Sequence, residues 1–186
     1  KIVRELSSWE RVVRIRKIIQ KQLGGYKSRV KHMLHCNGVE MPERFAKPST
    51  HWSRAFIKWL KENVTLLSPT RKSLDLLIMQ VEALRSTLLT ATREVRKLAL
   101  LDRYKDNYEL LRGIPGVGTI VAMSILTEIY DVTRFKNEKQ FASYLGLIPT
   151  SHSSGDKESH GEMTFRGNKQ LGSMIIETCW IAISRD

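Results

Sequence analysis

Residues 74–98 have the most regular hydrophobic pattern in the chain and read LDLLIMQVEALRSTLLTATREVRKL. Hydrophobic residues recur there at alternating steps of three and four: Leu74, Leu77, Val81, Leu84, Leu88, Ala91, Val95 and Leu98. Heptads of this kind predict one long α-helix in a coiled coil or a bundle. Two interpretations stay open. The apolar seam packs on another helix of the same chain, or it joins two copies of the chain in a homo-oligomer.

The segment before these heptads predicts a basic amphipathic helix. Apolar residues from Ile2 to Leu34 recur mostly at three- or four-residue steps, and Gly24-Gly25 is a point where the helix can loosen. Lys and Arg fill the positions between them and predict a basic outer face that binds nucleic acid. The candidate contacts on this face are Arg11, Arg14, Lys17, Lys21, Lys27, Arg29 and Lys31. A loop over 37–49 and a short helix containing Trp52, Phe56, Trp59 and Leu60 follow.

The positive charge of the chain is unevenly distributed. Residues 1–72 hold 17 Lys and Arg against 5 Asp and Glu, which equals the whole net charge of +12. Such a density neutralises phosphates and releases their counterions, so nucleic acid is the leading expected partner. The alternative is a solvated helix face that happens to be rich in lysine.

Other features narrow the class of protein. The longest uncharged stretches, 113–127 and 140–155, are too short to span a bilayer, so no membrane partner is expected. Cys36 and Cys179 predict free, partly buried thiols of a reducing cytoplasm, and no metal-ligand spacing surrounds them. The chain opens on Lys1, without a signal peptide and as though inside a helix, which suggests a piece of a longer protein.

A glycine-rich turn divides the C-terminal half. Residues 110–119 read LLRGIPGVGT, and this turn cannot continue a helix although the residues on both sides favour one. The pattern predicts a helix-hairpin-helix, whose second helix begins with backbone N–H groups that can hold a phosphate. Gly116, Gly118 and Thr119 are the candidate DNA contacts. The alternative is a plain connector between two packed helices.

Two further helices are expected after this turn. Asn137 and Gln140 form a capping box for a helix that ends at Gly146, and Gly167-Asn168 opens a last, core-facing helix with Trp180 and Ile183 on its apolar side. The polar residues 150–157 predict a surface loop. The expected fold is mainly all-α. Residues 1–105 form a basic helical and coiled-coil region, and residues 106–186 form a compact helical domain.

Several motifs together resemble one known family. These are residues 113–118 (GIPGVG), 134–135 (RF), 140–149 (QFASYLGLIP), 153–155 (SSG) and 166–168 (RGN), in this order. They resemble the insertion-sequence transposases that combine an N-terminal RuvC-like DEDD nuclease domain with a C-terminal serine domain. Some members of that family are guided by a structural bridge RNA. The resemblance is strong over about 110–182 and weaker over 1–105.

The resemblance implies roles for individual residues. Ser154, directly before Gly155, would be the nucleophile that attacks a DNA phosphodiester, with Ser153 as its less favoured neighbour. A free serine hydroxyl is a weak nucleophile and needs activation. In the family, Mg²⁺ held by the acidic residues of the N-terminal domain supplies it, so no cofactor is expected in this chain. The cations near the serine, expected to contact DNA, are Lys157, Arg166 and Lys169.

The same resemblance sets wider expectations. The partners are DNA and, in guided members, a structural RNA, the location is the bacterial cytoplasm, and the isolated chain is catalytically inert. Two departures remove cations that the family pattern has: Phe165, and Gly172 after Leu171. Two other interpretations stay open: a non-catalytic nucleic-acid-binding module in which Ser154 is a plain loop residue, and a purely structural helical bundle.

Overall fold

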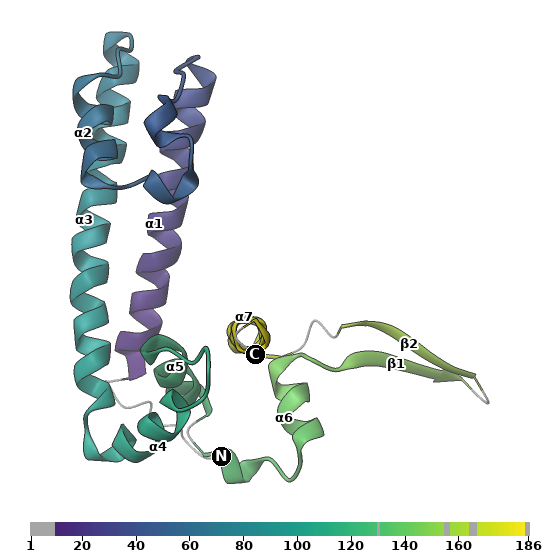
Figure 1. The fold of residues 1–186 in the computed structure, drawn as a ribbon. Helices are drawn as coiled ribbons and strands as arrows, with labels where there is room; N and C mark the ends of the chain where they lie inside the picture. The colour runs from purple at the N-terminus through teal and green to yellow at the C-terminus, as the bar shows by residue number, and fades with distance from the viewer. Residues whose placement is uncertain (1–9, 130, 155–156, 164–166, 185–186) are drawn as a thin grey trace. The chain divides into compact units, whose positions relative to one another are not determined.

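The computed structural model describes residues 10–129, 131–154, 157–163 and 167–184, and only the backbone over 149–154 and 157–163. Helices dominate these residues (Figure 1), which confirms the prediction of a mainly all-α fold. Packing divides the chain into two compact units. We call residues 14–92 the long-helix unit, and residues 1–13 with 93–186 the C-terminal unit.

Three α-helices build the long-helix unit. Their bounds are α1 (Glu10–Cys36), α2 (Arg54–Glu62) and α3 (Ser68–Ala99), with short 3-10 turns at Glu43–Phe45 and Pro48–Thr50. The first and last of them extend into the other unit. The loosening expected at Gly24-Gly25 is wrong, because α1 continues through both glycines. Ser53 caps α2, since its Oγ accepts the Phe56 N–H at 3.1 Å. The expected short helix is therefore confirmed, beginning after Trp52.

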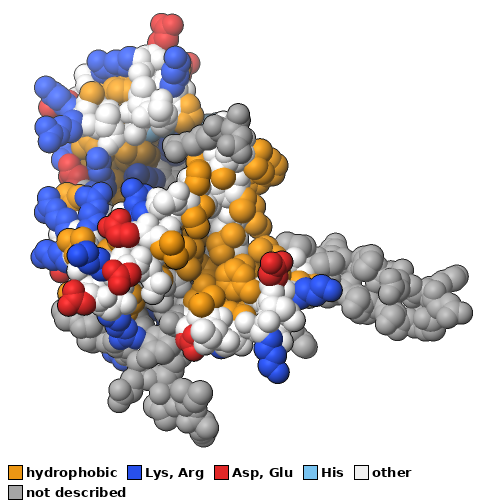
Figure 2. All heavy atoms as spheres, turned by 60° about the horizontal axis from the view of Figure 1, so that its bottom comes forward, with side chains coloured by type: hydrophobic (Ala, Val, Ile, Leu, Met, Phe, Trp, Pro, Cys, Tyr) orange, Lys and Arg blue, Asp and Glu red, His pale blue; other side chains and the backbone are white. Residues whose placement is uncertain are grey.

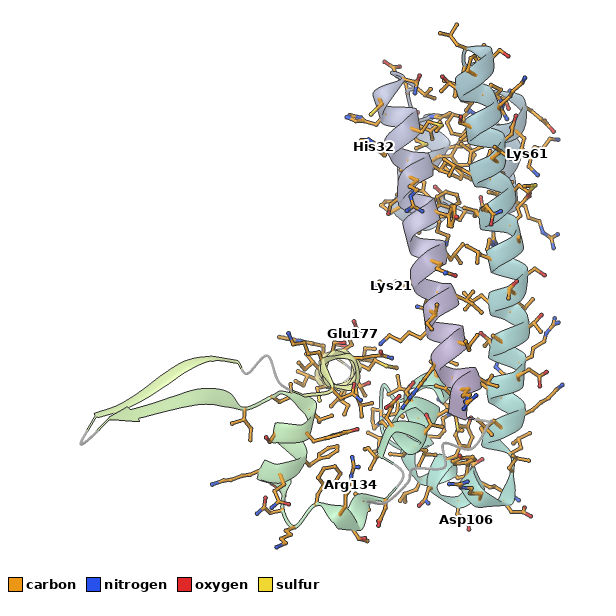
Figure 3. The ribbon with its side chains drawn as sticks, turned by 180° about the vertical axis from the view of Figure 1, so that it is seen from behind. Lys21, His32, Lys61, Asp106, Arg134 and Glu177 are labelled. Carbon is orange, nitrogen blue, oxygen red and sulfur yellow. The ribbon has the colours of Figure 1, made fainter. Side chains whose placement is uncertain are left out.

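The heptad seam of α3 packs within the chain. Leu74 and Val81 are fully buried, and α1 and α3 run side by side (Figures 1 and 3). Leu74 lies in one core cluster with Val30 of α1 and Phe56 of α2. The packing within one chain is thus confirmed for this part of the seam. Homo-oligomerisation through the same heptads stays a prediction.

In the part of the C-terminal unit that the structure describes, four helices, all shorter than α1 and α3, pack around two cores. Val95 and Leu98 at the end of α3 pack on Tyr104 and Met123, and a second core gathers around Leu145. Because of this packing, residues 93–105 lie in the C-terminal unit, and the expected boundary at residue 105 falls inside a helix. The helices are α4 (Asp102–Arg112), α5 (Thr119–Ile129), α6 (Glu138–Leu145) and α7 (Lys169–Ile183).

A pair of strands replaces the loop expected over residues 150–157. β1 (Pro149–Ser154) pairs antiparallel with β2 (Lys157–Met163), with a register irregularity between Pro149 and Ser151. The loop prediction was wrong because these strands have almost no apolar residues, so the alternating pattern that indicates a half-buried strand is missing.

The outer face of α7 corrects a second expectation. Trp180 and Ile183 were expected in the core, but 68% and 69% of their surfaces are exposed. A helix that is apolar nearly all round needs neighbours on every side, and α7 contacts α5 and α6 on only part of its circumference. Figure 2 shows the resulting exposed hydrophobic surface. Cys36 and Cys179 are free as expected but exposed, not partly buried.

Candidate functional site

The connection between α4 and α5 is fixed from two sides. Arg112 donates from Nη1 to the Val117 carbonyl at 2.8 Å, which ties the end of α4 to the far side of the turn. Gly116 has φ +83°, and a Cβ at this position would lie 2.8 Å from the Thr178 carbonyl oxygen of α7. Gly116 therefore serves the close approach of the turn to α7, a role that the sequence pattern did not reveal.

The other two candidates of this turn lie at the start of α5. The Gly118 carbonyl accepts the Ala122 N–H at 2.9 Å, so the first α-helical hydrogen bond of α5 begins there. The Thr119 hydroxyl lies 3.0 Å from the Tyr108 hydroxyl of α4. The backbone N–H groups of residues 119–121 precede any helical partner, and the positive end of the helix dipole lies beside them. This geometry suits an anion, and DNA binding here stays a prediction.

Ser154 is the last residue of β1. It pairs in register with Lys157, the first residue of β2, so the backbone brings these two predicted residues together across the strand pair. The positions of their side chains, like the whole of Arg166, lie outside the described residues. Gly155-Asp156 is a dipeptide favoured in two-residue hairpin turns, and it is the signal that could have predicted the strands.

Two glycines bring the ends of this strand pair together. Gly146 ends α6 in the left-handed conformation with φ +73°, and Gly167 has φ +131°. A Cβ on Gly167 would lie only 2.6 Å from the Gly146 nitrogen, and the Asn168 N–H donates to the Tyr144 carbonyl at 2.7 Å. The segment that contains Ser154 therefore leaves and re-enters the helical core at one closely packed backbone contact.

The predicted caps on both sides of this contact are confirmed. Asn137 Oδ1 accepts the Gln140 N–H at 3.0 Å at the start of α6, and Asn168 Oδ1 accepts the Leu171 N–H at 3.1 Å at the start of α7. Gln140 Oε1 reaches back to the Lys136 N–H at 2.9 Å, one residue before the cap. These hydrogen bonds hold both helix starts that flank the strand pair.

Gly172 gives one departure from the family pattern a structural reason. It is buried, and a Cβ there would lie 2.6 Å from the Leu145 carbonyl oxygen at the end of α6. A larger residue cannot enter without moving α7 away from α6. Gly172 therefore permits the close packing of α7 on the end of α6. Lys169, the remaining described cation near the cap, is exposed.

An aromatic cluster supports the motif at residues 134–135. The Arg134 guanidinium lies 4.6 Å from the ring centres of both Phe135 and Tyr144. The Tyr144 hydroxyl donates to the Glu128 carbonyl at 3.2 Å, which joins α6 to α5. Just before the motif, hydrogen bonds from the hydroxyl and the backbone N–H of Thr133 hold the pKa of Asp131 below its ordinary value.

The predicted basic face of α1 is present with one exception. Arg11, Lys21, Arg29 and Lys31 are exposed, Arg14 and Lys17 are half-buried, and Figure 3 shows Lys21 pointing away from α3. Lys27 is the exception, because its Nζ lies 5.5 Å from the centre of the Trp52 ring on the inner side of the helix. Burial, then the charges of Arg85 and Lys31, lower the pKa of Lys27.

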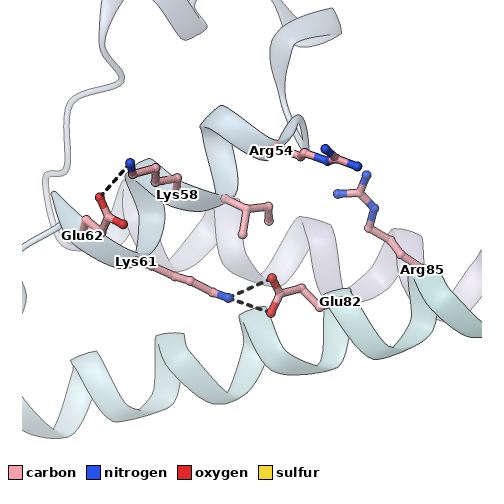
Figure 4. A pocket seen from close by; sticks show the side chains of 7 residues that line it. Arg54, Lys58, Lys61, Glu62, Glu82 and Arg85 are labelled. Atoms are coloured by element: carbon pink, nitrogen blue, oxygen red, sulfur yellow. Dashed lines mark hydrogen bonds and ion pairs between the residues drawn. The ribbon is translucent and has the colours of Figure 1, made fainter.

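The sequence did not predict a basic hollow that lies between α2 and α3. It has a volume of about 500 Å³ (Figure 4), and its lining residues are Arg54, Ile57, Lys58, Lys61, Glu62, Glu82 and Arg85. Lys61 binds Glu82 at 2.8 Å and Lys58 lies 3.8 Å from Glu62, whereas Arg54 and Arg85 turn their guanidinium groups toward each other. The spacing of Arg54 and Lys58 by four residues on a helix was the only local signal.

The described residues do not fit a metal site, and none of their helices has the length and hydropathy needed to cross a bilayer. No group of three or more His, Cys, Asp or Glu comes together among them.

Part of the C-terminal unit is similar to a known family of proteins. Residues 108–186, from the middle of α4 to the end of the chain, match the family model described as Transposase IS116/IS110/IS902 family. They include the turn at Gly116, the strand pair and α7. None of the solved structures is significantly similar to this chain.

Several curated relatives carry related names. The transposase for insertion sequence element IS1111A of Coxiella burnetii is 31% identical over 80 residues, 43% of this chain and 22% of that protein. The insertion element IS110 uncharacterized 43.6 kDa protein of Streptomyces coelicolor is 32% identical over 129 residues, 66% and 30% of the two chains. The pilin gene-inverting protein of Moraxella bovis is 37% identical over 67 residues, 36% and 21% of the two. The aligned part is thus less than a third of each relative's length.

Proposed function

We propose that this chain is the C-terminal part of a DNA transposase of the IS110/IS116 type, which binds DNA and rearranges it by strand cleavage and exchange. The observation that carries this proposal is the family match over residues 108–186, which includes the strand pair and the turn between α4 and α5. One similar protein is named for inverting a pilin gene and another for an insertion sequence, and both names describe a rearrangement of DNA.

Ser154 is the proposed nucleophile. Its backbone position at the end of β1, directly before Gly155, leaves no bulky side chain on the following residue to hinder a phosphodiester. In the proposed step, Ser154 Oγ loses its proton and forms a bond to phosphorus, while the bond from phosphorus to one sugar oxygen breaks. The product is a phosphoserine that holds one strand, and the released sugar hydroxyl takes the proton.

The remaining predicted contacts are proposed to position the DNA. The turn at Gly116, Gly118 and Thr119 is proposed to act as a helix-hairpin-helix, with phosphate at the start of α5. The DNA strand that Ser154 attacks is proposed to contact Lys157, Arg166 and Lys169. A guide RNA is proposed as a further partner. Homo-oligomerisation and a location in the bacterial cytoplasm complete the proposal. The 186 residues alone are proposed not to cleave, because no group of three or more His, Cys, Asp or Glu that could hold an activating metal comes together among the described residues.

The first experiment tests the nucleophile directly. The full-length protein is incubated with the DNA ends of its element, any associated RNA and Mg²⁺, and a denaturation-resistant protein–DNA adduct is sought. We expect the adduct from wild type and from Ser153→Ala, and its loss in Ser154→Ala with DNA binding retained. An adduct that survives in Ser154→Ala would remove this residue from the chemistry.

The same experiment tests a second candidate function, that of a nucleic-acid-binding module without catalytic activity. If wild type binds DNA tightly without any adduct, and Ser154→Ala behaves identically, the chain is a non-catalytic nucleic-acid-binding module. The net charge of +12 favours that alternative over a purely structural bundle, because phosphate neutralisation predicts salt-dependent binding.

A further inference from the structure

The hollow between α2 and α3 has more positive charge than its own acids neutralise. Four cations and two acids line it, and both acids are engaged, Glu82 by Lys61 at 2.8 Å and Glu62 by Lys58 at 3.8 Å. Arg54 and Arg85 remain without an acidic partner among the described residues, and their guanidinium groups face each other (Figure 4). Two facing guanidinium groups repel each other unless an anion lies between them.

Arg85 is held in this orientation by an unusual backbone. Trp52 has φ +67°, a left-handed conformation that bulky residues rarely adopt, and its carbonyl accepts a hydrogen bond from Arg85 Nη1 at 2.6 Å. Such strain persists only where the surroundings enforce it, and it is concentrated at functional sites. The hydrogen bond uses one of the five N–H donors of Arg85 and leaves the others for a ligand.

The surroundings of the hollow raise the local positive potential further. Lys27 lies against the Trp52 ring, and its pKa is lowered first by burial and then by the nearby charge of Arg85. The long-helix unit as a whole has 15 Lys and Arg against 5 Asp and Glu. An anionic ligand is therefore attracted both at long range and inside the hollow.

From these observations we infer that the hollow binds a backbone phosphate of a nucleic acid between Arg54 and Arg85. A guanidinium group presents paired N–H donors that match two phosphate oxygens, and the phosphate relieves the repulsion between the two arginines. The site would recognise the phosphate backbone of the nucleic acid and not its base sequence. It adds a second nucleic-acid contact to the proposed function, on which it rests only for the class of ligand.

The experiment measures binding of the full-length protein to a 30-base-pair DNA duplex and, separately, to a folded RNA hairpin at several salt concentrations. Arg54→Gln is the main variant, because Arg54 is exposed and makes no ion pair with the acids of the hollow, which are bound by Lys58 and Lys61. Lys72→Gln is the matched control, since it removes the same charge from an exposed position of α3 outside the hollow.

We expect Arg54→Gln to weaken binding about tenfold at low salt. The slope of log K against log salt should fall by about 0.9, the contribution of one phosphate contact. Lys72→Gln should weaken binding less than about twofold, and Arg85→Lys, which keeps the charge but loses the paired donors, should weaken it measurably. A loss on RNA alone assigns the site to RNA, a loss on DNA alone to DNA, and a loss on both to any phosphodiester backbone.

Equal effects of Arg54→Gln and Lys72→Gln on both ligands would overturn the inference, because only net charge would then matter. That result leaves the proposed nucleophile untouched, since the adduct of Ser154 is measured separately. If wild type shows no salt-dependent binding to either ligand, the inference and the nucleic-acid part of the proposed function fail together.

Discussion

Single glycines decide how the C-terminal unit packs. At Gly116, Gly167 and Gly172 a Cβ would lie 2.6–2.8 Å from a backbone atom of another segment, closer than real Cβ atoms come. At Gly118 nothing lies within 4 Å of the added carbon. Glycines of one motif therefore have different physical roles, and only a subset permits the close approach of α7 to its neighbours.

This difference predicts a large loss of stability for one substitution and almost none for a neighbouring one. Gly116→Ala should lower the free energy of unfolding by about 1–3 kcal/mol, because of its positive φ and of the contact with the Thr178 carbonyl. Gly118→Ser should stay within about 0.5 kcal/mol, since the space is open and serine is a favoured cap. Chemical denaturation monitored by circular dichroism measures both. Similar losses in the two variants would show that Gly116 does not carry the contact.

At the scale of elements, α1 tolerates an unfavourable composition. It remains helical across Gly24-Gly25, although each glycine weakens a helix interior by roughly 0.5–1 kcal/mol relative to alanine. Its stability comes from packing, because Val30 and Leu34 on one face are almost fully buried in the core shared with α2 and α3. Tertiary contacts thus override the local preference that predicted a loosened helix.

Because both glycines are exposed helical positions with open space around them, Gly24→Ala with Gly25→Ala should stabilise the long-helix unit. The expected gain is about 1–2 kcal/mol for the pair, and it should appear as a higher midpoint of thermal unfolding. Gly38→Ala is the control, since its φ of +65° should make the same change destabilising. A destabilised double variant would mean that α1 is interrupted at these glycines in solution.

At the scale of the whole molecule, the two units differ in net charge. The long-helix unit has 15 Lys and Arg against 5 Asp and Glu, whereas the remaining residues have 16 against 14. Figure 2 shows clustered Lys and Arg side chains and, elsewhere, an exposed hydrophobic surface. The unit without the proposed nucleophile is therefore the one that supplies most long-range attraction for nucleic acid.

Charge removal from the two units should accordingly have unequal effects. Lys21→Gln with Lys31→Gln on α1 should reduce the slope of log K against log salt by about 2 for duplex DNA, since each phosphate contact contributes roughly 0.9. Lys136→Gln with Lys139→Gln, an equal charge change at exposed residues of the C-terminal unit, should alter the slope by less than half as much. Fluorescence anisotropy at several salt concentrations measures this. Equal changes of slope for the two pairs would contradict the proposal that the long-helix unit supplies most of the attraction for nucleic acid.

The sequence by itself determined the features that depend on near neighbours along the chain. Helical periodicity predicted α3, the caps at Asn137 and Asn168 predicted the starts of α6 and α7, and the left-handed Gly146 ended α6 as expected. The excess of Lys and Arg also followed directly from composition.

Only the tertiary structure decided what these elements meet. It placed Lys27 against Trp52, left Trp180 exposed, paired the polar strands β1 and β2, and set Arg54 opposite Arg85 in a hollow. The physical reason is that burial and charge pairing depend on residues far apart in the chain. Local periodicity gives the faces of a helix but does not identify which face its neighbours cover.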